Sequence, residues 1–162
     1  MATVFKGVSG HRDDNQSMQI STEFPIRMDY DVVWGEMDAF GHVNNTVYFR
    51  YFETIRVRYF EQIGTSLSIA SEGFTPILAS AKCDFKYPVV YPDRLRIEAG
   101  VTRIGTSSYN IAYRIFSSAQ QLVVALGDSV VVNLDSRTKR PVPLPPEMLA
   151  RICQIEGVEL KS

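Results

Sequence analysis

Apolar and polar residues alternate with two different periods along this chain. In residues 24–34 every second position is apolar or aromatic, which is typical of a β-strand with one buried face. In residues 47–63 the apolar positions recur every three or four residues instead, which is typical of a helix. Gly64 follows the last of these positions and is a common helix stop. The pattern therefore predicts a strand and then one long helix, whose apolar face is wide enough to be wrapped on much of its circumference.

Four more strands are predicted after the helix, at residues 77–87, 94–102, 108–115 and 122–134. The first three alternate with period two, whereas the last is almost continuously apolar, as expected for a central strand covered on both faces. The connections at 105–107 and 117–120 are short, which indicates an antiparallel meander. A proline-rich stretch then leads into a short terminal helix, expected at residues 147–155.

One helix packed on one antiparallel sheet is a two-layer α+β domain. A length of 162 residues suits one domain. We expect residues 1–22, which are polar and lack a period, to be an irregular leader. Residues 23–162 are then expected to form the single domain.

Charge and composition narrow the partners and the compartment. The chain has 17 Lys and Arg against 18 Asp and Glu, a net charge of -1, which argues against non-specific binding to nucleic acid or an acidic membrane. No apolar stretch approaches the roughly 20 residues that span a bilayer, and the first residues do not resemble a signal peptide. Only two cysteines are present, as in reduced proteins. We therefore expect a cytoplasmic protein with no nucleic-acid partner and no membrane insertion.

Several common site signatures are missing from the sequence. There is no paired Cys or His spacing for a metal, no P-loop and no dinucleotide-binding glycine pattern. No G-x-S-x-G nucleophile motif occurs beyond a partial match in the leader, and nothing local favours Cys83 and His42 as a nucleophilic pair. We expect neither a metal nor another cofactor.

Residues 34–48 are rich in polar functional groups, although they join two of the most apolar stretches of the chain. Asn44 is a suitable N-cap, and the N–H groups of residues 45–47 then point out of the helix start, where the helix dipole favours negative charge. Such donors polarise the carbonyl group of a thioester and stabilise its oxyanion. Asp38, one short loop earlier, is the expected nucleophile or general base.

Structural roles compete with this interpretation. An aspartate before a glycine in a turn is often only an Asx-turn residue, and His42 and Asn44 beside a helix start are often caps. Tyr48 is more typical of a core, and Glu53 of an ion pair with Arg50 or Arg56. The residue types alone leave the choice open.

The same stretch resembles the hotdog-fold thioesterases, specifically the 4-hydroxybenzoyl-CoA thioesterase-like group of acyl-CoA thioesterases. The residues that carry the resemblance are Asp38-Ala39-Phe40-Gly41-His42-Val43-Asn44-Asn45, Tyr48, Tyr51-Phe52-Glu53, Arg56, Phe85-Lys86-Tyr87-Pro88, Pro92-Asp93, Gly105-Thr106-Ser107-Ser108 and Pro143-Leu144-Pro145. The resemblance implies a five-stranded antiparallel sheet around one long helix. It also implies an acyl-CoA substrate and a homodimer or homotetramer with active sites at the subunit interface.

Site residues follow from the resemblance position by position. It implies that Asp38 is catalytic and that the Asn45 backbone N–H polarises the carbonyl group, and His42 is a further catalytic candidate. Gly41, Asn44, Tyr48 and Phe52 are the expected substrate-binding residues. The sequence departs from the family pattern at Glu36, where Asp is usual, and at Ala39, where some members have Pro. The second departure leaves open whether Asp38 attacks directly or activates water.

Two rival functions fit the sequence less well. A hydratase or dehydratase of acyl thioesters typically carries a catalytic His followed by Pro, whereas Val43 follows His42 here. A non-catalytic acyl-CoA-binding regulator needs a DNA-binding helix-turn-helix, for which a 22-residue leader is too short. The acyl group, and the choice between coenzyme A and acyl carrier protein, stay open, as does phosphate binding by the cations of residues 137–140.

Overall fold

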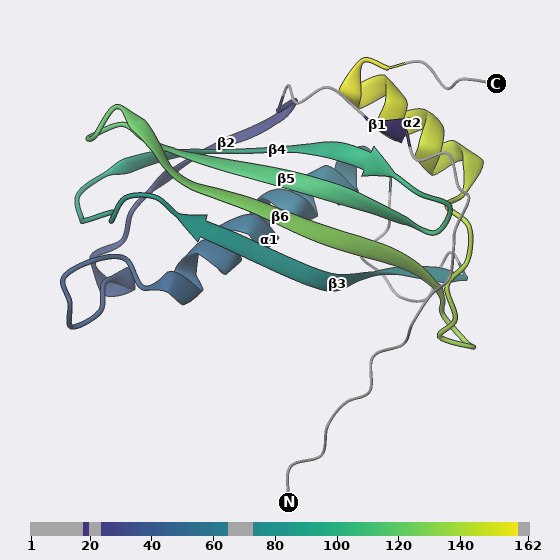
Figure 1. Ribbon diagram of the computed structural model, residues 1–162, viewed down its shortest axis with the longest axis horizontal. Coiled ribbons are helices and arrows are strands. Elements are labelled where there is room, and N and C mark those ends of the chain that lie inside the picture. The colour runs from purple at the N-terminus through teal and green to yellow at the C-terminus, as the bar shows by residue number, and fades with distance from the viewer. Residues whose placement is uncertain (1–17, 20–23, 65–72, 159–162) are drawn as a thin grey trace, which may run out of the picture.

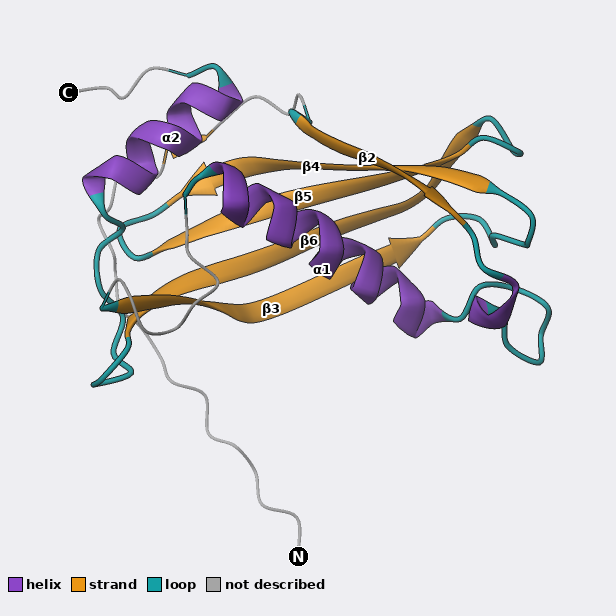
Figure 2. Ribbon diagram, turned by 180° about the vertical axis from the view of Figure 1, so that it is seen from behind, coloured by secondary structure: helices purple, strands orange, loops and turns teal. Residues whose placement is uncertain are grey.

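One long helix lies across one face of an antiparallel sheet (Figures 1 and 2). This computed structural model describes residues 18–19, 24–64 and 73–158. The helices are α1 (Asn45–Gln62) and α2 (Pro146–Glu156), with a 3₁₀ turn η1 (Trp34–Glu36). The strands are β1 (Met18–Gln19), β2 (Ile26–Asp31), β3 (Phe74–Phe85), β4 (Arg94–Ile104), β5 (Ser108–Ser117) and β6 (Leu122–Asp135). Five strands of six or more residues around one long helix confirm the predicted α+β hotdog fold, and β1 adds a two-residue pairing.

The sheet has the order β1-β4-β5-β6-β3, and β2 also pairs with β4. All of these pairs are antiparallel, as the short connections predicted. β1 and β2 therefore share one side of β4, whereas β3 forms the opposite edge of the sheet. The predicted order of one strand, a long helix and then four strands is confirmed.

Helix α1 is stable because its wide apolar face packs on the inner face of the sheet. Its buried residues are Val47, Tyr48, Tyr51, Phe52, Ile55, Arg56, Tyr59 and Phe60. Opposite them, every second residue of β5 is buried, from Tyr109 to Ile115. The helix ends just before Gly64, whose φ of 72° lies in the left-handed region that glycine adopts without strain. The predicted helix and its stop are thus confirmed.

The central strand β6 is covered on one face only. Val131 and Ser129 on its inner face are fully buried. On its outer face Val130 and Val132 are half-buried and Leu126 is 39% exposed, because α1 covers only the other side of the sheet. The expectation that this strand is covered on both faces is wrong for the described chain.

The predicted first strand runs too far at both ends. β2 begins at Ile26 and ends at Asp31, and the chain then turns into η1. Trp34, which the alternation placed on the buried face, is 70% exposed. The strand stops because the Val33 N–H donates to the Glu36 carboxylate rather than to a neighbouring strand, which closes the 3₁₀ turn.

Helix α2 packs beside β4, on the edge of that strand which also pairs with β1 and β2. β4 pairs with β2 up to Ala99 and with β1 from Arg103 onward, and Val101 lies between these two stretches. The Val101 N–H donates to Oε1 of Glu156 at 2.7 Å, and the Tyr59 hydroxyl donates to the same oxygen at 2.6 Å. Burial raises the pKa of Glu156. This carboxylate therefore ties α2 to both α1 and β4.

The predicted terminal helix is confirmed as α2, which begins at Pro146 and is followed by Gly157 at a φ of 65°. Of the predicted leader, only residues 18–19 fall within the described residues, and they form β1. In the described ranges no helix has both the length and the apolar character that crossing a bilayer requires.

Candidate active site

The connection between β2 and α1 is a compact loop with its own hydrogen bonds. Met37 and Val43 form an isolated antiparallel bridge, and inside it the Asp38 N–H donates to the His42 carbonyl group at 2.9 Å. The Gly41 N–H donates back to the Asp38 carbonyl group at 2.9 Å. Gly41 has a φ of 78°, so a side chain there would strain the turn. The sequence thus folds Asp38 into a fixed position before the helix.

Glu36 anchors this loop to the core. Its carboxylate accepts the hydroxyl groups of Tyr30 at 2.6 Å and Tyr51 at 2.8 Å, as well as the Val33 N–H at 3.0 Å. Its carbonyl group accepts the Asn44 N–H at 2.9 Å. Burial and the adjacent carboxylate raise the pKa of Tyr30 to about 12 and that of Tyr51 further still, so both phenols stay protonated donors. Glu36 therefore holds both ends of the loop.

Both carboxylate oxygens of Asp38 have a partner within the loop. Oδ1 accepts the Phe40 N–H at 2.9 Å, which is the Asx turn expected on structural grounds. Oδ2 accepts Nδ2 of Asn44 at 3.1 Å. Each carboxylate oxygen has two lone pairs, so these two bonds leave acceptor capacity on a half-buried group. The Asx turn thus fixes the orientation of the Asp38 carboxylate and leaves it able to react.

Asn44 links this carboxylate to the helix start. Its Oδ1 accepts the Thr46 N–H at 3.0 Å and the Thr46 hydroxyl at 2.7 Å, which confirms the predicted N-cap. Its carbonyl group accepts the Val47 N–H at 2.9 Å. The Asn45 N–H has no acceptor among the residues that the structure describes, as expected for the first helical position. This donor carries the partial positive charge of the helix dipole.

A pocket of about 230 Å³ opens beside this helix start. It is lined by His42, Val43, Asn45, Tyr48, Phe85, Lys86, Tyr87 and Pro88. The Tyr48 and Phe85 rings meet edge to face with centroids 5.1 Å apart, and burial raises the pKa of Tyr48 to about 12. Within the described residues, no group of three or more His, Cys, Asp or Glu side chains is arranged to hold a metal ion.

The predicted site residues occupy four different places. Asn45, His42 and Tyr48 line the pocket. Asp38 and Asn44 are not among its lining residues but are joined to each other by their side chains, and Asn44 directly precedes Asn45 in the chain. Gly41 is exposed in the turn. Phe52 is 1% exposed, stacks on Tyr113 with centroids 4.5 Å apart and does not line the pocket.

The far wall of the pocket was not predicted as part of the site. Phe85 ends β3, and the N–H groups of Lys86 and Tyr87 both donate to the Val124 carbonyl group, at 2.9 and 3.1 Å. This wall lies about 40 residues from the helix start in the sequence, and the fold brings the two together: the Val43 N–H donates to the Val89 carbonyl group at 2.8 Å, and the Tyr48 ring meets that of Phe85. Its signal in the sequence was the run of aromatic residues that ends the third predicted stretch of alternation.

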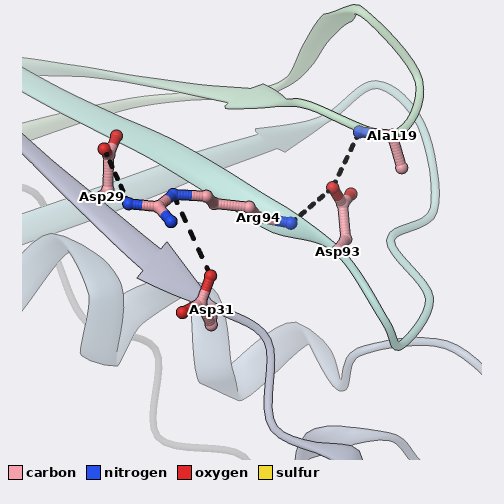
Figure 3. A network of polar contacts seen from close by, with 5 residues as sticks. All are labelled: Asp29, Asp31, Asp93, Arg94 and Ala119. Carbon is pink, nitrogen blue, oxygen red and sulfur yellow. Dashed lines mark hydrogen bonds and ion pairs between the residues drawn. The ribbon is translucent and has the colours of Figure 1, made fainter.

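Asp93 fixes the loops that support this wall. Its carboxylate accepts the Arg94 N–H at 2.7 Å and the Ala119 N–H at 2.9 Å, and Arg94 reaches on to Asp29 and Asp31 (Figure 3). Its carbonyl group accepts the Val32 N–H at 2.9 Å. Asp93 thus joins β2, the start of β4 and the turn after β5 at the same end of the sheet.

Glu53 does not form the expected ion pair with Arg50 or Arg56. The five ion pairs within the described residues involve neither Glu53 nor these arginines. Glu53 is exposed, whereas Arg56 turns inward and donates to the Tyr113 hydroxyl at 3.1 Å. The Arg56 side chain therefore packs inward instead of pairing with Glu53 along the helix surface.

Known proteins share both the sequence and the fold. The uncharacterized protein YsmA of Bacillus subtilis (strain 168) is 32% identical over 92 residues, which are 57% of this chain and 61% of YsmA, so the match spans about three fifths of that relative. The PA2801 protein of Pseudomonas aeruginosa is 31% identical with a TM-score of 0.72, covering 80% of this chain and 99% of its own. A thioesterase from Thermus thermophilus, solved with coenzyme A and Zn, is 30% identical with a TM-score of 0.73, covering 86% of this chain and 100% of its own.

The sequence profile of one protein family covers most of the chain. It matches residues 32–152, which include the loop with Asp38, helix α1 and strands β3 to β6. The chain therefore belongs to the thioesterase-like superfamily.

Proposed function

We propose that this protein hydrolyses acyl-coenzyme A thioesters, with Asp38 as nucleophile or general base. The observation that carries the proposal is the side-chain hydrogen bond between Asp38 and Asn44, the N-cap of α1. It couples a carboxylate to a helix start at which Asn45 lines a pocket and the Asn45 N–H has no acceptor among the described residues. A carboxylate beside an oriented N–H donor is the minimal equipment for acyl transfer to water.

In the proposed reaction, the thioester oxygen accepts the Asn45 N–H. This contact strengthens as the oxygen becomes an oxyanion, because the helix dipole favours negative charge there. Asp38 either attacks the carbonyl carbon or takes a proton from the water that attacks it. If Asp38 activates water, the water oxygen bonds to the carbonyl carbon, the carbon–sulfur bond breaks, and the thiolate takes up the proton that Asp38 removed. If Asp38 attacks directly, breaking the carbon–sulfur bond leaves a mixed anhydride on Asp38, and a water then hydrolyses this anhydride and supplies the proton that the thiolate takes up. We assign His42, an exposed residue that lines the same pocket, to hydrogen bonding of the leaving sulfur.

The remaining candidate residues receive supporting roles. Asn44 orients Asp38 through Nδ2, and Gly41 permits the turn that brings Asp38 beside it. Tyr48 contacts the acyl group in a pocket that also contains Phe85 and Tyr87. Phe52, buried against Tyr113, supports the pocket from below rather than touching the thioester. Binding of coenzyme A by the Thermus thermophilus relative favours that carrier over an acyl carrier protein.

We further propose that the active protein is at least a homodimer that pairs through β3. This strand forms one edge of the sheet and is twelve residues long. Its side chains Ile77, Leu78 and Phe85 are each 43–44% exposed. A long, apolar and unpaired edge is a liability in an isolated subunit, and pairing with a second copy removes it. Because Phe85 also lines the pocket, a partner at this edge would lie close to the site.

Cytoplasmic location is part of the same proposal. Cys83 and Cys153 are both free thiols, as expected in a reducing compartment. Burial raises the pKa of Cys83 to about 11, so its thiol is a poor nucleophile. This supports Asp38, rather than Cys83, as the reacting group.

The proposal is tested by incubating the purified protein with a panel of aliphatic and aromatic acyl-CoA esters and titrating the released thiol. Hydrolysis should release one thiol for each ester consumed. Loss of the ester's unsaturation without thiol release would instead indicate a hydratase. Tight binding of acyl-CoA with no turnover of any ester would indicate a non-catalytic binding protein and would overturn the proposal.

A further inference from the structure

Four polar side chains meet in the core between α1 and the sheet. Arg56 of α1 is 7% exposed and donates from its guanidinium group to the Tyr113 hydroxyl at 3.1 Å. The Tyr113 hydroxyl lies 2.6 Å from Oγ of Ser129, which is fully buried on β6. Tyr109, 1% exposed, is near enough for the Arg56 charge to act on its hydroxyl group, which has no hydrogen-bond partner within the described residues. We call these four residues the Arg56 cluster.

The cluster has an uncompensated positive charge. Of the ion pairs within the described residues, none contains Arg56. Burial raises the pKa of both Tyr109 and Tyr113, so neither phenol ionises to balance the guanidinium group. A guanidinium group stays protonated at any ordinary pH. The guanidinium group is not wholly withdrawn from water, because its Nε and Nη2 are not among the buried side-chain atoms without a partner. Its positive charge is nevertheless balanced by no acidic side chain among the described residues, so an anion that reaches it gains a favourable contact.

The cluster offers donors that suit an anion. The guanidinium group has five N–H donors in a planar fork that matches a carboxylate, and one contact with Tyr113 leaves most of them free to bind. The unpartnered Tyr109 hydroxyl adds a further donor. Asp128 also acts on Tyr113, but more weakly than Arg56 does, and its register partner Ala112 places it on the other face of the sheet. No acidic side chain belongs to the cluster itself.

Its position relates it to the pocket. Tyr48, Phe52 and Arg56 follow one another at spacings of four residues, so they form one stripe on α1, about 12 Å long at the rise of a helix. Tyr48 lines the pocket, Phe52 stacks on Tyr113, and Arg56 donates to the hydroxyl of the same Tyr113. The stripe therefore runs from the thioester pocket to the guanidinium group.

We propose that the Arg56 cluster binds a monovalent anion of carboxylate size. The ligand is either a free anion, such as chloride or formate, or a carboxylate at the far end of the acyl group. The second source rests on the proposed thioesterase function, and the first does not.

The first experiment measures thermal unfolding and needs no substrate. The melting temperature of the full chain is followed in formate or chloride, with bulky gluconate keeping the ionic strength constant. At a concentration ten times the dissociation constant, binding should raise the melting temperature by about 3–5 °C. In Arg56→Met the melting temperature should no longer depend on formate or chloride. In gluconate alone this variant should be at least as stable as the wild type.

Two controls make this result specific. Arg58→Met removes an exposed arginine from the same helix and should keep the full anion dependence. Arg56→Lys keeps the positive charge but not the planar fork of donors, so its melting temperature should still rise with the anion, but at higher anion concentrations than in the wild type. This variant replaces Arg56→Met in the test if Arg56→Met does not fold.

The second experiment compares octanoyl-CoA with suberoyl-CoA, which differ only in a terminal carboxylate. If the acyl group supplies the anion, Arg56→Met should lower kcat/KM for suberoyl-CoA at least tenfold and leave that for octanoyl-CoA unchanged. A response in either experiment that depends on Arg56 supports the anion site and identifies its source. Equal melting temperatures in all salts, together with an unchanged ratio for the two esters, would overturn it. Lack of turnover of every ester defeats the thioesterase proposal but leaves the first experiment decisive.

Discussion

Replacing Asp38 with asparagine separates its chemistry from its part in the turn. The amide oxygen can still accept the Phe40 N–H, which closes the Asx turn at 2.9 Å in the wild type. The amide nitrogen, however, takes the place of Oδ2 and meets Nδ2 of Asn44, so two donors face each other. Asn44 cannot turn its amide over without losing the cap on Thr46. One hydrogen bond is therefore lost.

The size of each effect follows from these contacts. A lost hydrogen bond at a half-buried position costs about 1 kcal/mol, which corresponds to a melting temperature lower by about 2–4 °C. Removing a nucleophile or general base lowers the turnover number at least about a hundredfold, or about 2.7 kcal/mol in the barrier. A protein with about 5 kcal/mol or more of stability stays folded after the first loss, so unfolding cannot explain the second.

The assay is steady-state release of thiol from the best acyl-CoA ester, with the melting temperature measured on the same preparations. Asp31→Asn is the matched control, because it removes one exposed carboxylate seven residues earlier without touching the loop. Its turnover number should stay within about a factor of two of the wild type. Near-normal turnover by Asp38→Asn would refute the role of Asp38 and direct attention to His42.

Three further predictions concern stability and assembly. Burial raises the pKa of Glu156, so its protonated form contributes stability that is complete below the ordinary pKa of 4.5 and is lost as pH rises through the raised pKa. Glu156→Gln should flatten this part of the curve of melting temperature against pH. An unchanged slope in that variant would count against the role of Glu156. Gly127→Ala places a methyl group 2.5 Å from two atoms of the Phe52 ring and should lower the free energy of unfolding by about 1–3 kcal/mol. Gly35→Ala is the control: its methyl group meets nothing within 4 Å, so the packing of the core should not change. Sedimentation should give a dimer or larger at micromolar concentration, which Ile77→Lys at the exposed β3 edge weakens; a fully active wild-type monomer would contradict this.

Periodicity was sufficient for the parts of the fold that are decided locally. The stripe of apolar residues predicts α1, and Asn44 and Gly64 mark its ends, because capping and left-handed glycine act within a few residues. The same local logic predicts the Asx turn of Asp38. The family resemblance then supplied the wrapped arrangement of the sheet, which periodicity only suggested.

The parts that failed depend on contacts between distant residues. Alternation places Trp34 in the core, but Glu36 binds Tyr51 from α1 and ends the strand before Trp34 is reached. Arg56 has an acidic neighbour on its own helix, yet its side chain goes to Tyr113, 57 residues away. No pattern within one segment reports which partner a side chain will meet across the fold.

The link between Glu156 and Val101 also has a consequence for how the chain folds during synthesis. The two residues are 55 positions apart, and every described strand of the sheet precedes Glu156 in the chain. Synthesis runs from the N-terminus, so all of these strands leave the ribosome before the carboxylate that the Val101 amide and the Tyr59 hydroxyl share in the folded protein. In the nascent sheet the Val101 N–H therefore lacks its acceptor, Oε1 of Glu156, until α2 emerges and packs beside β4. During that interval the Val101 amide is exposed to solvent exchange, although the strands on either side of it have already paired.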